Sequence, residues 1–182
     1  QALGSRAPTY RRKLGEVLGR TIPEDWIVLP DRTVKGKAEL DLGGRTLRLR
    51  THPTAHTNND LTVYDEATGT WWLSDLVFME RVPSLDGSLK GWVGVLDRLR
   101  EREARRIVPG HGPVSAPWPE ASGPIGSYLK TLLSGIRKAI EEGQTMREAY
   151  EEVGWDQKDR WRLFEAYHRR NVSTAYAELE WE

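Results

Sequence analysis

The order of the predicted elements indicates a mixed α/β domain built from α+β layers. Polar and apolar residues alternate with the period of a strand in Arg45–Arg50, directly after the dipeptide Gly43-Gly44. From Ser88 onward the apolar residues recur at helical spacing, and one short strand separates the first of these helices from a helical remainder. Strands, a helix, a strand and a helical tail together predict a sheet covered by helices.

The N-terminal elements follow from local patterns. A helix is predicted over Pro8–Gly19, and the apolar run Asp25–Pro30 predicts a buried strand. Glycine pairs favour the tight turns of hairpins, so two strands should flank Gly43-Gly44. A second strand pair should enclose a turn at residues 65–69. The four strands predicted in this region are Lys37–Leu42, Arg45–Arg50, Leu61–Tyr64 and Thr70–Leu73.

The C-terminal elements are mostly helical. Ser88 can cap a helix that runs to Glu103, and a strand is predicted over Arg106–Pro109. After a proline-rich connector, four helices are predicted: Gly123–Gly143, Thr145–Val153, Gln157–Arg169 and Asn171–Glu180. The sheet has few strands for a free-standing domain of this size, as a domain cut in half would have.

Composition excludes several classes of function. The chain has 182 residues with 38% hydrophobic and 30% charged side chains, which is typical of a globular protein. Lys+Arg equals Asp+Glu at 27 each, so no net charge favours nucleic acid or an anionic membrane. No run reaches the roughly 18 apolar residues that a membrane-spanning helix requires. The absence of cysteine excludes disulfides, cysteine nucleophiles and thiolate metal sites.

Three potential metal ligands stand where predicted strands meet loops. His56 follows the second strand, Asp75 lies at the end of the segment Trp71–Asp75, and His111 follows the fifth strand between Gly110 and Gly112. Imidazole and carboxylate are ligands that zinc accepts, and catalytic zinc sites use such sets. Flanking glycines would let the backbone approach closely. Spacing alone leaves two interpretations open, a metal site or side chains that cap loops and pair locally.

The segments around these residues resemble a known family. The segments are THPTAHT (residues 51–57), LSDLVF (73–78) and VPGHGP (108–113). They resemble the third, fourth and fifth motifs of the metallo-β-lactamase superfamily. Their order also matches, with 19 and 36 residues between successive ligand-type residues. The resemblance extends over roughly residues 8 to 182.

Further segments narrow the resemblance. Residues 83–92 (PSLDGSLKGW) and the region from Tyr167 to Trp181 are similar to the quinoprotein relay system zinc metallohydrolases. Two positions depart from the superfamily pattern, where glycine is usual: Ser74 precedes the aspartate and Ala55 precedes the histidine. Both are compact residues, so the departures are small.

The resemblance implies a fold, a cofactor and a reaction. The fold would be the second half of an αββα sandwich, over residues 1–122, with a helical C-terminal tail at 123–182 packed on it. His56 would complete a first zinc site, Asp75 would bridge two zinc ions as the catalytic carboxylate, and His111 would bind the second zinc. Zinc-bound hydroxide would hydrolyse an ester, thioester or lactam of a small-molecule substrate. The resemblance to this family implies a periplasmic or secreted protein, and a cytoplasmic location is the alternative.

The superfamily's main ligand cluster, His-x-His-x-Asp-His, is missing. It belongs upstream of His56, yet the first 51 residues contain no histidine. Three explanations compete: a fragment whose N-terminal half is lost, the second chain of a split enzyme, or a degenerate homologue. We therefore expect this chain alone to be inactive, and its partner to be its own N-terminal fragment or a second copy. The alternative function is a non-catalytic interaction module or inactive half-domain that pairs with a partner chain.

Four further residues have two interpretations each. Asp60 is a candidate to orient the His56 ring from the second coordination shell, or it forms a turn. Arg81 follows the Asp75 strand and is a candidate for the substrate rim, where it would grip an anion. His168 is either a rim residue or a packed helix histidine. His52 is interpreted as a surface histidine rather than a ligand, because Pro53 interrupts the strand.

Overall fold

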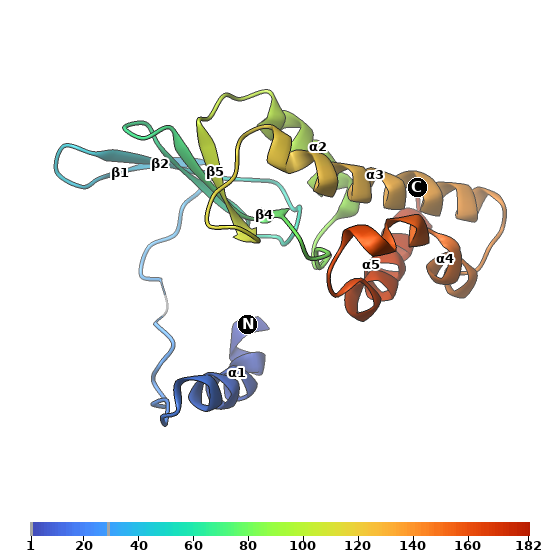
Figure 1. The fold of residues 1–182 in the computed structure, drawn as a ribbon, viewed down its shortest axis with the longest axis horizontal. Helices are drawn as coiled ribbons and strands as arrows, with labels where there is room; N and C mark the ends of the chain where they lie inside the picture. Colours follow the sequence, from blue (N-terminus) through green and yellow to red (C-terminus); the bar gives the residue numbers. More distant parts are fainter. Residues whose placement is uncertain (1, 29) are drawn as a thin grey trace. The chain divides into compact units, whose positions relative to one another are not determined.

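The computed structural model describes residues 2–28 and 30–182, which divide into two compact units, Gln1–Thr33 and Val34–Glu182. The second unit holds a five-stranded sheet and most of the helices (Figure 1). Its strands are β1 (Lys37–Asp41), β2 (Thr46–Thr51), β3 (Leu61–Asp65), β4 (Thr70–Phe78) and β5 (Arg106–His111). Its helices are α2 (Leu89–Arg100), α3 (Gly123–Glu141), α4 (Met146–Glu152) and α5 (Phe164–Leu179), with 3-10 turns η1 (Glu120–Ser122) and η2 (Trp155–Arg160).

The first unit differs from its prediction in two ways. Helix α1 spans Ala2–Leu18 and contains Pro8, which the sequence analysis had placed at the helix start. The strand predicted over Asp25–Pro30 is wrong for the described residues, and Leu29 lies outside them. Asp25 lies in a turn, and Val28 is 92% exposed. An apolar run becomes a strand only when another strand pairs with it, and the described part of this unit provides none.

The sheet confirms the predicted hairpin and extends the fourth strand. Its order is β1-β2-β3-β4-β5, with antiparallel pairs up to β4 and a parallel pair between β4 and β5. Gly43 and Gly44 have φ of 79° and 86°, which other residues rarely adopt, and Asp41 pairs with Thr46 across them. Strand β4 continues to Phe78 rather than ending at Leu73.

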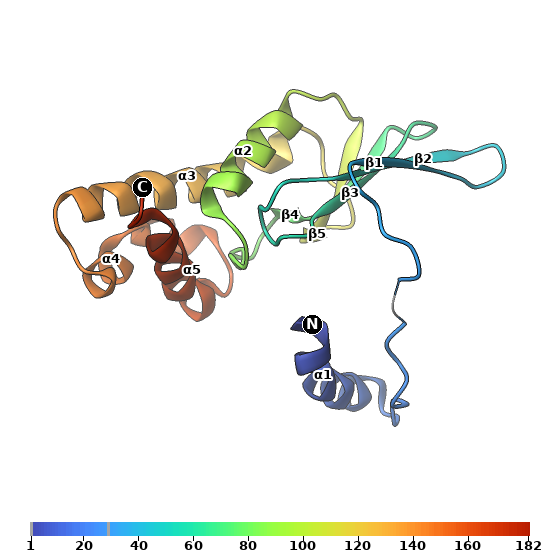
Figure 2. The same cartoon turned by 180° about the vertical axis from the view of Figure 1, so that it is seen from behind.

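Helices cover one face of the sheet and leave the other open to solvent. Trp71 and Leu73 are buried against helical residues that include Trp92, whereas Trp72 between them is 36% exposed. Adjacent strand residues point to opposite faces, so this alternation identifies the covered face. Figure 2 shows α2 and α3 side by side, with α4 and α5 beyond them on the side away from the β1–β2 hairpin.

The helical tail confirms α3 and α4 but corrects the next two predicted helices. Instead of breaking near residue 170, the chain forms the single helix α5. The break lies earlier, at Leu163, whose φ of 58° is incompatible with a continuing helix. Asn171 lies inside α5 and is 1% exposed. Its side chain makes buried hydrogen bonds to residues outside the helix instead of capping a helix end.

A buried polar network ties α5 to α3 and to the segment before α2. The Nε2 of His168 donates to the carbonyl of Val153 at 2.8 Å, so Nδ1 accepts from the Tyr128 hydroxyl at 3.0 Å. Asn171 donates to that hydroxyl at 3.0 Å and to the carbonyl of Pro83 at 2.7 Å. His168 is fully buried, so of its two interpretations the rim position is wrong and the packed position is correct.

The tail and the sheet belong to the same compact unit, because α3 packs against α2. The division of the fold at residue 122 stays a prediction. No described helix combines the length and the apolar character needed to cross a bilayer.

Candidate functional site

The three candidate ligands lie at one end of the β4–β5 pair. His56 stands in the loop between β2 and β3, Asp75 is the sixth of the nine residues of β4, and His111 is the last residue of β5. Because β4 and β5 are parallel, Phe78 and His111 pair at the carboxyl ends of both strands. The Phe78 ring connects the two histidines, with centroids 5.6 Å from His56 and 4.6 Å from His111.

The loop that carries His56 is held against the segment before α2. The backbone N–H of Ser88 donates to the carbonyl of Ala55 at 2.8 Å, and that of Asp86 donates to the carbonyl of His56 at 3.2 Å. A Cβ atom at Gly87 would lie 2.4 Å from the Ala55 carbonyl, so only glycine permits this approach. The backbone of His56 is therefore fixed by the segment Asp86–Ser88, which leads into helix α2.

The His56 ring lies in an aromatic pocket with one polar neighbour. The Trp92 ring meets the His56 ring edge-on, with centroids 5.2 Å apart. The His56 side chain is 9% exposed. Its Nδ1 lies 3.8 Å from an Asp60 carboxylate oxygen, which is too long for a hydrogen bond.

Asp60 instead closes the turn that follows His56. It accepts from the backbone N–H of Thr57 at 3.0 Å and from the Thr57 hydroxyl at 2.7 Å. Burial would raise the pKa of Asp60, but the His56 ring and the Thr57 donors outweigh it and lower that pKa. The structure thus supports the turn-forming interpretation of Asp60. For Asp60 to orient the His56 ring, its carboxylate and the His56 Nδ1 would have to come closer than 3.8 Å.

Asp75 is turned out of the regular ladder by its neighbours. Ser74 adopts φ of 49°, and the register between β4 and β5 shifts on both sides of it. A Cβ atom at Gly110 would lie 1.9 Å from a carboxylate oxygen of Asp75, so that oxygen occupies the space a side chain would fill. This explains why a glycine precedes His111, as the sequence predicted for a close backbone approach.

His111 faces Asp75 and stays partly open to solvent. Its Nε2 lies 3.6 Å from an Asp75 oxygen, and the two side chains are 38% and 37% exposed. Burial lowers the pKa of His111, with Arg81 and His56 contributing in the same direction and Asp75 opposing them. A lowered pKa favours the neutral imidazole, which is the form that binds metal ions.

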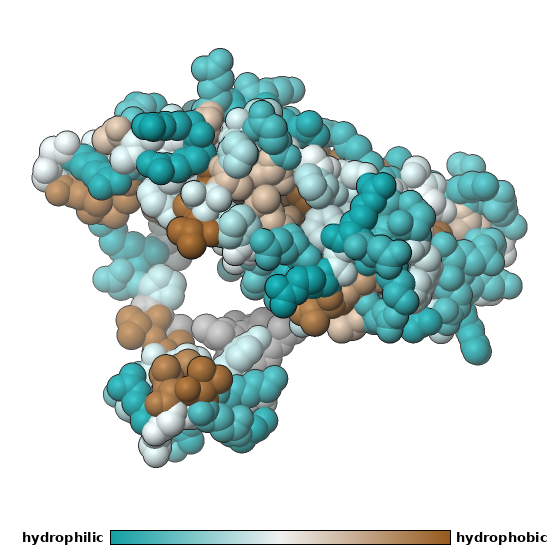
Figure 3. Space-filling view, viewed as in Figure 1, coloured by the Kyte–Doolittle hydropathy of each residue, from teal (hydrophilic) through white to brown (hydrophobic). Residues whose placement is uncertain are grey.

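A shallow cleft runs from His56 to Asp75 across the open face of the sheet. It has a volume of about 420 Å³, and Asp60, Ser74 and Trp72 also line it. Beside this cleft lies a mostly apolar hollow of about 510 Å³. Val63, Trp72 and Ser74 line both the hollow and the cleft. Figure 3 shows brown hydrophobic patches at the surface over the sheet, among mainly hydrophilic surroundings.

The donors fit zinc in kind but not in number. Two imidazoles and a carboxylate are a set that zinc accepts, and Gly110 leaves room for Asp75 beside His111. Within residues 2–28 and 30–182, however, no three His, Asp or Glu side chains are grouped closely enough to hold a metal ion. The described residues therefore do not form a complete zinc site.

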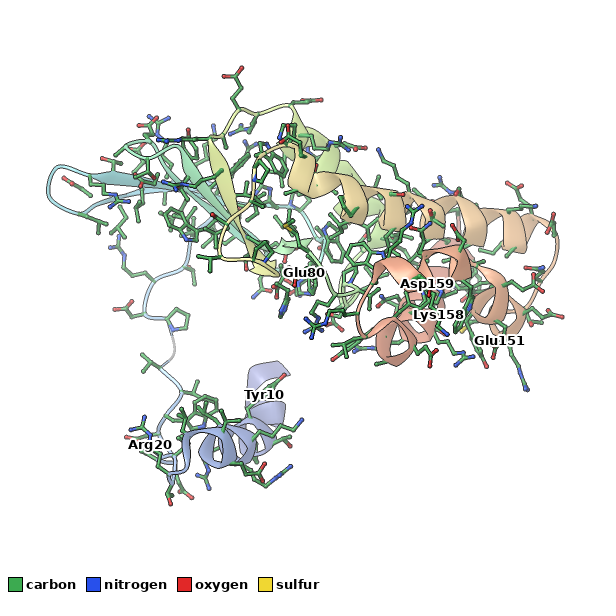
Figure 4. The ribbon with its side chains drawn as sticks, viewed as in Figure 1. Tyr10, Arg20, Glu80, Glu151, Lys158 and Asp159 are labelled. Carbon is green, nitrogen blue, oxygen red and sulfur yellow. The ribbon has the colours of Figure 1, made fainter. Side chains whose placement is uncertain are left out.

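Arg81 lies next to this group, which the sequence had suggested from its position alone. The carbon at the centre of its guanidinium lies 5.8 Å from the centre of the Phe78 ring and 5.2 Å from that of Tyr167. Its neighbour Glu80 is labelled in Figure 4, near the end of β5.

Sequence reasoning missed Phe78 and Trp92, the rings that pack on the candidate ligands. Phe78 is the last residue of the LSDLVF segment, and Trp92 follows the SLKG turn into α2, so only the fold brings them to His56. His52, which the sequence suggested as a surface histidine, is instead half-buried and hydrogen-bonds Thr62 at 2.9 Å.

Comparison with known proteins identifies the fold. No protein-family model matches the sequence, and neither does any curated protein. Among solved structures, a metallo-β-lactamase from Pontibacter korlensis has a TM-score of 0.50 and 24% identity, over 65% of this chain and 62% of its own. The stereoselective inverting sec-alkylsulfatase Pisa1 from Pseudomonas sp. has a TM-score of 0.68 and 15% identity, over 84% of this chain and 27% of its own.

A β-lactamase domain protein from Burkholderia ambifaria gives a TM-score of 0.61 and 15% identity, over 92% of this chain and 49% of its own. The chain thus spans less than two thirds of each of these structures. At such identities the likeness concerns the fold. The mixed α/β fold of this chain therefore resembles a part of each of these three structures.

Proposed function

We propose that this chain supplies one part of the active site of a zinc-dependent hydrolase of the metallo-β-lactamase superfamily. The observation that carries the proposal is the approach of His111 Nε2 to within 3.6 Å of Asp75, at the strand ends where His56 also lies. Zinc, when bound, lowers the pKa of its water to about 7 and polarises a carbonyl or ester group.

The remaining ligands of the site would come from outside the described residues. The chain spans 62%, 49% and 27% of the structures it resembles, which leaves room for a further part in each. The His-x-His-x-Asp-His cluster would belong to that part, on a preceding segment or on a separate chain. The motifs shared with quinoprotein relay metallohydrolases support a periplasmic protein with a small-molecule substrate.

The chain's own residues would have distinct roles at such a site. His111 and Asp75 would hold the metal from the strand ends, and His56 would bind from the loop that α2 fixes. Phe78 would keep both imidazoles in place, because its ring contacts each of them. Gly110 would keep the space that Asp75 needs.

Zinc binding by the intact 182-residue chain tests the proposal. Equilibrium dialysis against a fixed free zinc concentration should give weak binding that His111→Ala and Asp75→Asn each weaken by roughly tenfold or more, as loss of a ligand does. His52→Gln is the matched control and should leave binding unchanged, because His52 is turned toward Thr62. Equal binding by all four proteins would overturn the proposed site.

The second candidate function is interaction with another protein without catalysis. The observation that favours it is the apolar hollow on the open sheet face, where Leu47, Val63 and Val108 surround the 36%-exposed Trp72. Apolar surface of this kind marks interaction sites in many proteins. The partner in this second candidate is another copy of the same chain.

Sedimentation of the chain over a range of concentrations tests this second candidate. Association that Trp72→Lys abolishes would support it. Trp181→Lys is the control, since Trp181 is 85% exposed and belongs to the C-terminal end rather than the sheet. A chain that remains monomeric at every concentration would count against pairing through this face.

A further inference from the structure

Strand β1 forms an open edge of the sheet. The sheet order places β1 and β5 at its two edges (Figure 1). The β5 edge already carries a segment, because the backbones of Ile107 and Ala116 exchange hydrogen bonds of 2.8 and 3.0 Å. Along β1 the side chains of Lys37, Glu39 and Asp41 are exposed, and no described strand pairs with its outer side. An open edge of this kind is a template for pairing with another strand.

The ladder between β1 and β2 determines which backbone groups of β1 point outward. The N–H of Thr51 donates to the carbonyl of Gly36 at 2.8 Å, in the register that continues along both strands. In an antiparallel pair, residues that bond across the ladder alternate with residues whose backbone groups face away. The odd-numbered residues Lys37, Glu39 and Asp41 therefore direct their N–H and carbonyl groups to the open side.

The charges along this edge are complementary to themselves. Alternate residues from position 35 are Lys35, Lys37, Glu39 and Asp41. A second copy, related by a two-fold axis at Ala38, would place its Glu39 opposite Lys37 and its Lys37 opposite Glu39. Lys35 of each copy would lie nearest Asp41 of the other. Opposite charges that face each other across a strand pair stabilise the pair, and like charges destabilise it.

The same charge order disfavours the other ways in which two β1 strands could pair. A shift by two residues would bring Glu39 opposite Glu39, or Lys37 opposite Lys37. Parallel pairing in register would set every charge beside its like. At the two-fold axis the facing Cα atoms would be about 4.5 Å apart, and the small side chain of Ala38 fits such a close approach. The edge thus specifies one antiparallel register.

The charged side chains of β1 are available to a partner. Among the ion pairs of the described residues, none includes Lys37 or Asp41, and Glu39 reaches only Arg48, at 3.5 Å. The side chains of Arg48 and Glu39 are 55% and 66% exposed. Exposed ion pairs of this kind hold their partners weakly, so Glu39 can accept a second cation.

We propose that two copies of this chain associate through their β1 edges, as an antiparallel pair with its two-fold axis at Ala38. Lys37 of each copy would exchange both backbone hydrogen bonds with Glu39 of the other. The two five-stranded sheets would become one continuous sheet with β5 at both ends, so association would stop at the dimer. Because the candidate metal ligands lie away from β1, this inference does not depend on the proposed function.

Amide hydrogen exchange of the intact chain, followed by NMR at several protein concentrations, tests the inference. A short edge pair is a small interface, so we expect a Kd on the order of 100 μM. At about ten times this Kd, exchange at the N–H groups of Lys37 and Glu39 should be about fivefold slower than in the dilute protein. Ala38 and Leu40 bond to β2 in either state and serve as internal controls. Exchange at Lys37 and Glu39 that does not depend on concentration would overturn the inference.

Charge reversal tests the register. Lys37→Glu and Glu39→Lys each bring like charges together in a pair of identical chains, so each variant alone should remain monomeric in sedimentation at about 1 mM, roughly ten times the Kd expected for the unaltered chain. An equimolar mixture of the two restores opposite charges and should associate. Arg147→Glu, the control, reverses an exposed charge on α4 and should associate like the unaltered chain. A mixture that remains monomeric would overturn the register, and single variants that associate like the unaltered chain would overturn the edge pairing.

Salt and Trp72→Lys distinguish the edge from the open sheet face. Pairing through exposed charges should weaken severalfold when NaCl is raised from about 0.05 M to about 0.5 M. It should also survive Trp72→Lys, because Trp72 is not part of β1. Association that Trp72→Lys abolishes and the β1 variants leave intact would overturn the inference in favour of the face. If a variant does not fold, hydrogen exchange in the unaltered chain still decides.

Discussion

Two pairs of histidines in this chain have opposite surroundings. His168 uses both ring nitrogens within the protein, at 2.8 and 3.0 Å, and His52 hydrogen-bonds Thr62 at 2.9 Å. His56 and His111 each face a carboxylate at 3.8 and 3.6 Å, beyond hydrogen-bond distance. The imidazoles of His168 in the helical tail and of His52 after β2 therefore help to hold the fold. The imidazoles of His56 and His111, which both contact Phe78 at the end of β4, make no hydrogen bond to a carboxylate and can bind a ligand.

Removing Asn171 should have the largest effect on stability, because it serves three groups. It accepts from the N–H of Leu85 at 2.9 Å and donates to the carbonyl of Pro83 and the hydroxyl of Tyr128. We expect Asn171→Ala to lower the free energy of unfolding by about 3–5 kcal/mol, since each buried group left unpaired costs about 1–3 kcal/mol. Urea denaturation followed by tryptophan fluorescence measures this.

A control in the same helix sharpens this expectation. Ser173 is a half-buried serine whose hydroxyl donates to the carbonyl of Arg169 in its own helix, so Ser173→Ala should change stability by less than about 0.5 kcal/mol. If Asn171→Ala unfolds no more easily than Ser173→Ala, the tail network does not hold the fold.

The next effect concerns the site rather than the tail. In Gly110→Ala the new methyl group would lie 1.9 Å from an oxygen of Asp75, so Asp75 must move or the strand must shift. We expect a loss of about 1–3 kcal/mol in stability together with weaker zinc binding. Gly123→Ala is the control, because a Cβ there meets nothing within 4 Å. Equal stability and zinc binding in both variants would show that Gly110 does not position Asp75.

The partnered histidines should make stability depend on pH. Burial lowers the pKa of His168, and it lowers that of His52 to about 4. Below about pH 6.5 the unfolded chain takes up protons at these histidines and the folded chain does not, so the free energy of unfolding should fall. For His52 this loss should continue down to about pH 4. Denaturation at about pH 7 and about pH 5.5 measures it, and His52→Gln should reduce the difference.

The smallest effect tests the strain beside Asp75. Ser74 has φ of 49°, a conformation that costs a non-glycine residue about 1–2 kcal/mol. Ser74→Gly should therefore stabilise the protein, by up to about 1 kcal/mol once the added freedom of the unfolded chain is counted. Ser115→Gly, at an exposed loop position without positive φ, should have the opposite sign. A loss of stability in both variants would mean that Ser74 is not strained.

Much of the sheet could be predicted because its signals are local. Gly43-Gly44 and the alternation in Arg45–Arg50 identify a hairpin without knowledge of the rest of the chain. The failures arise where tertiary contacts decide. Among the residues that the structure describes, the part of the run at 25–30 outside residue 29 pairs with no strand. Asn171, which the sequence placed at the start of a new helix, is instead buried within α5, where it makes hydrogen bonds.

The candidate site was only partly accessible from the sequence. The resemblance picked out His56, Asp75 and His111, and the glycines beside His111 pointed to close packing. The contact of Phe78 with both imidazoles and the position of Arg81 over Tyr167 could not be predicted, because they depend on the paths of distant segments. The hydrogen bond from the Ser88 N–H to the Ala55 carbonyl, which holds the His56 loop, could not be predicted for the same reason.

The most direct test of the account follows all four histidines at once. Zinc is added stepwise to the ¹⁵N-labelled chain, and the imidazole signals are recorded by NMR. The account predicts that His56 and His111 shift with zinc, while His52 and His168 remain unchanged as internal controls. A zinc response confined to His52 or His168, or none at His56 and His111, would contradict the claim that the ends of β4 and β5 carry the metal ligands.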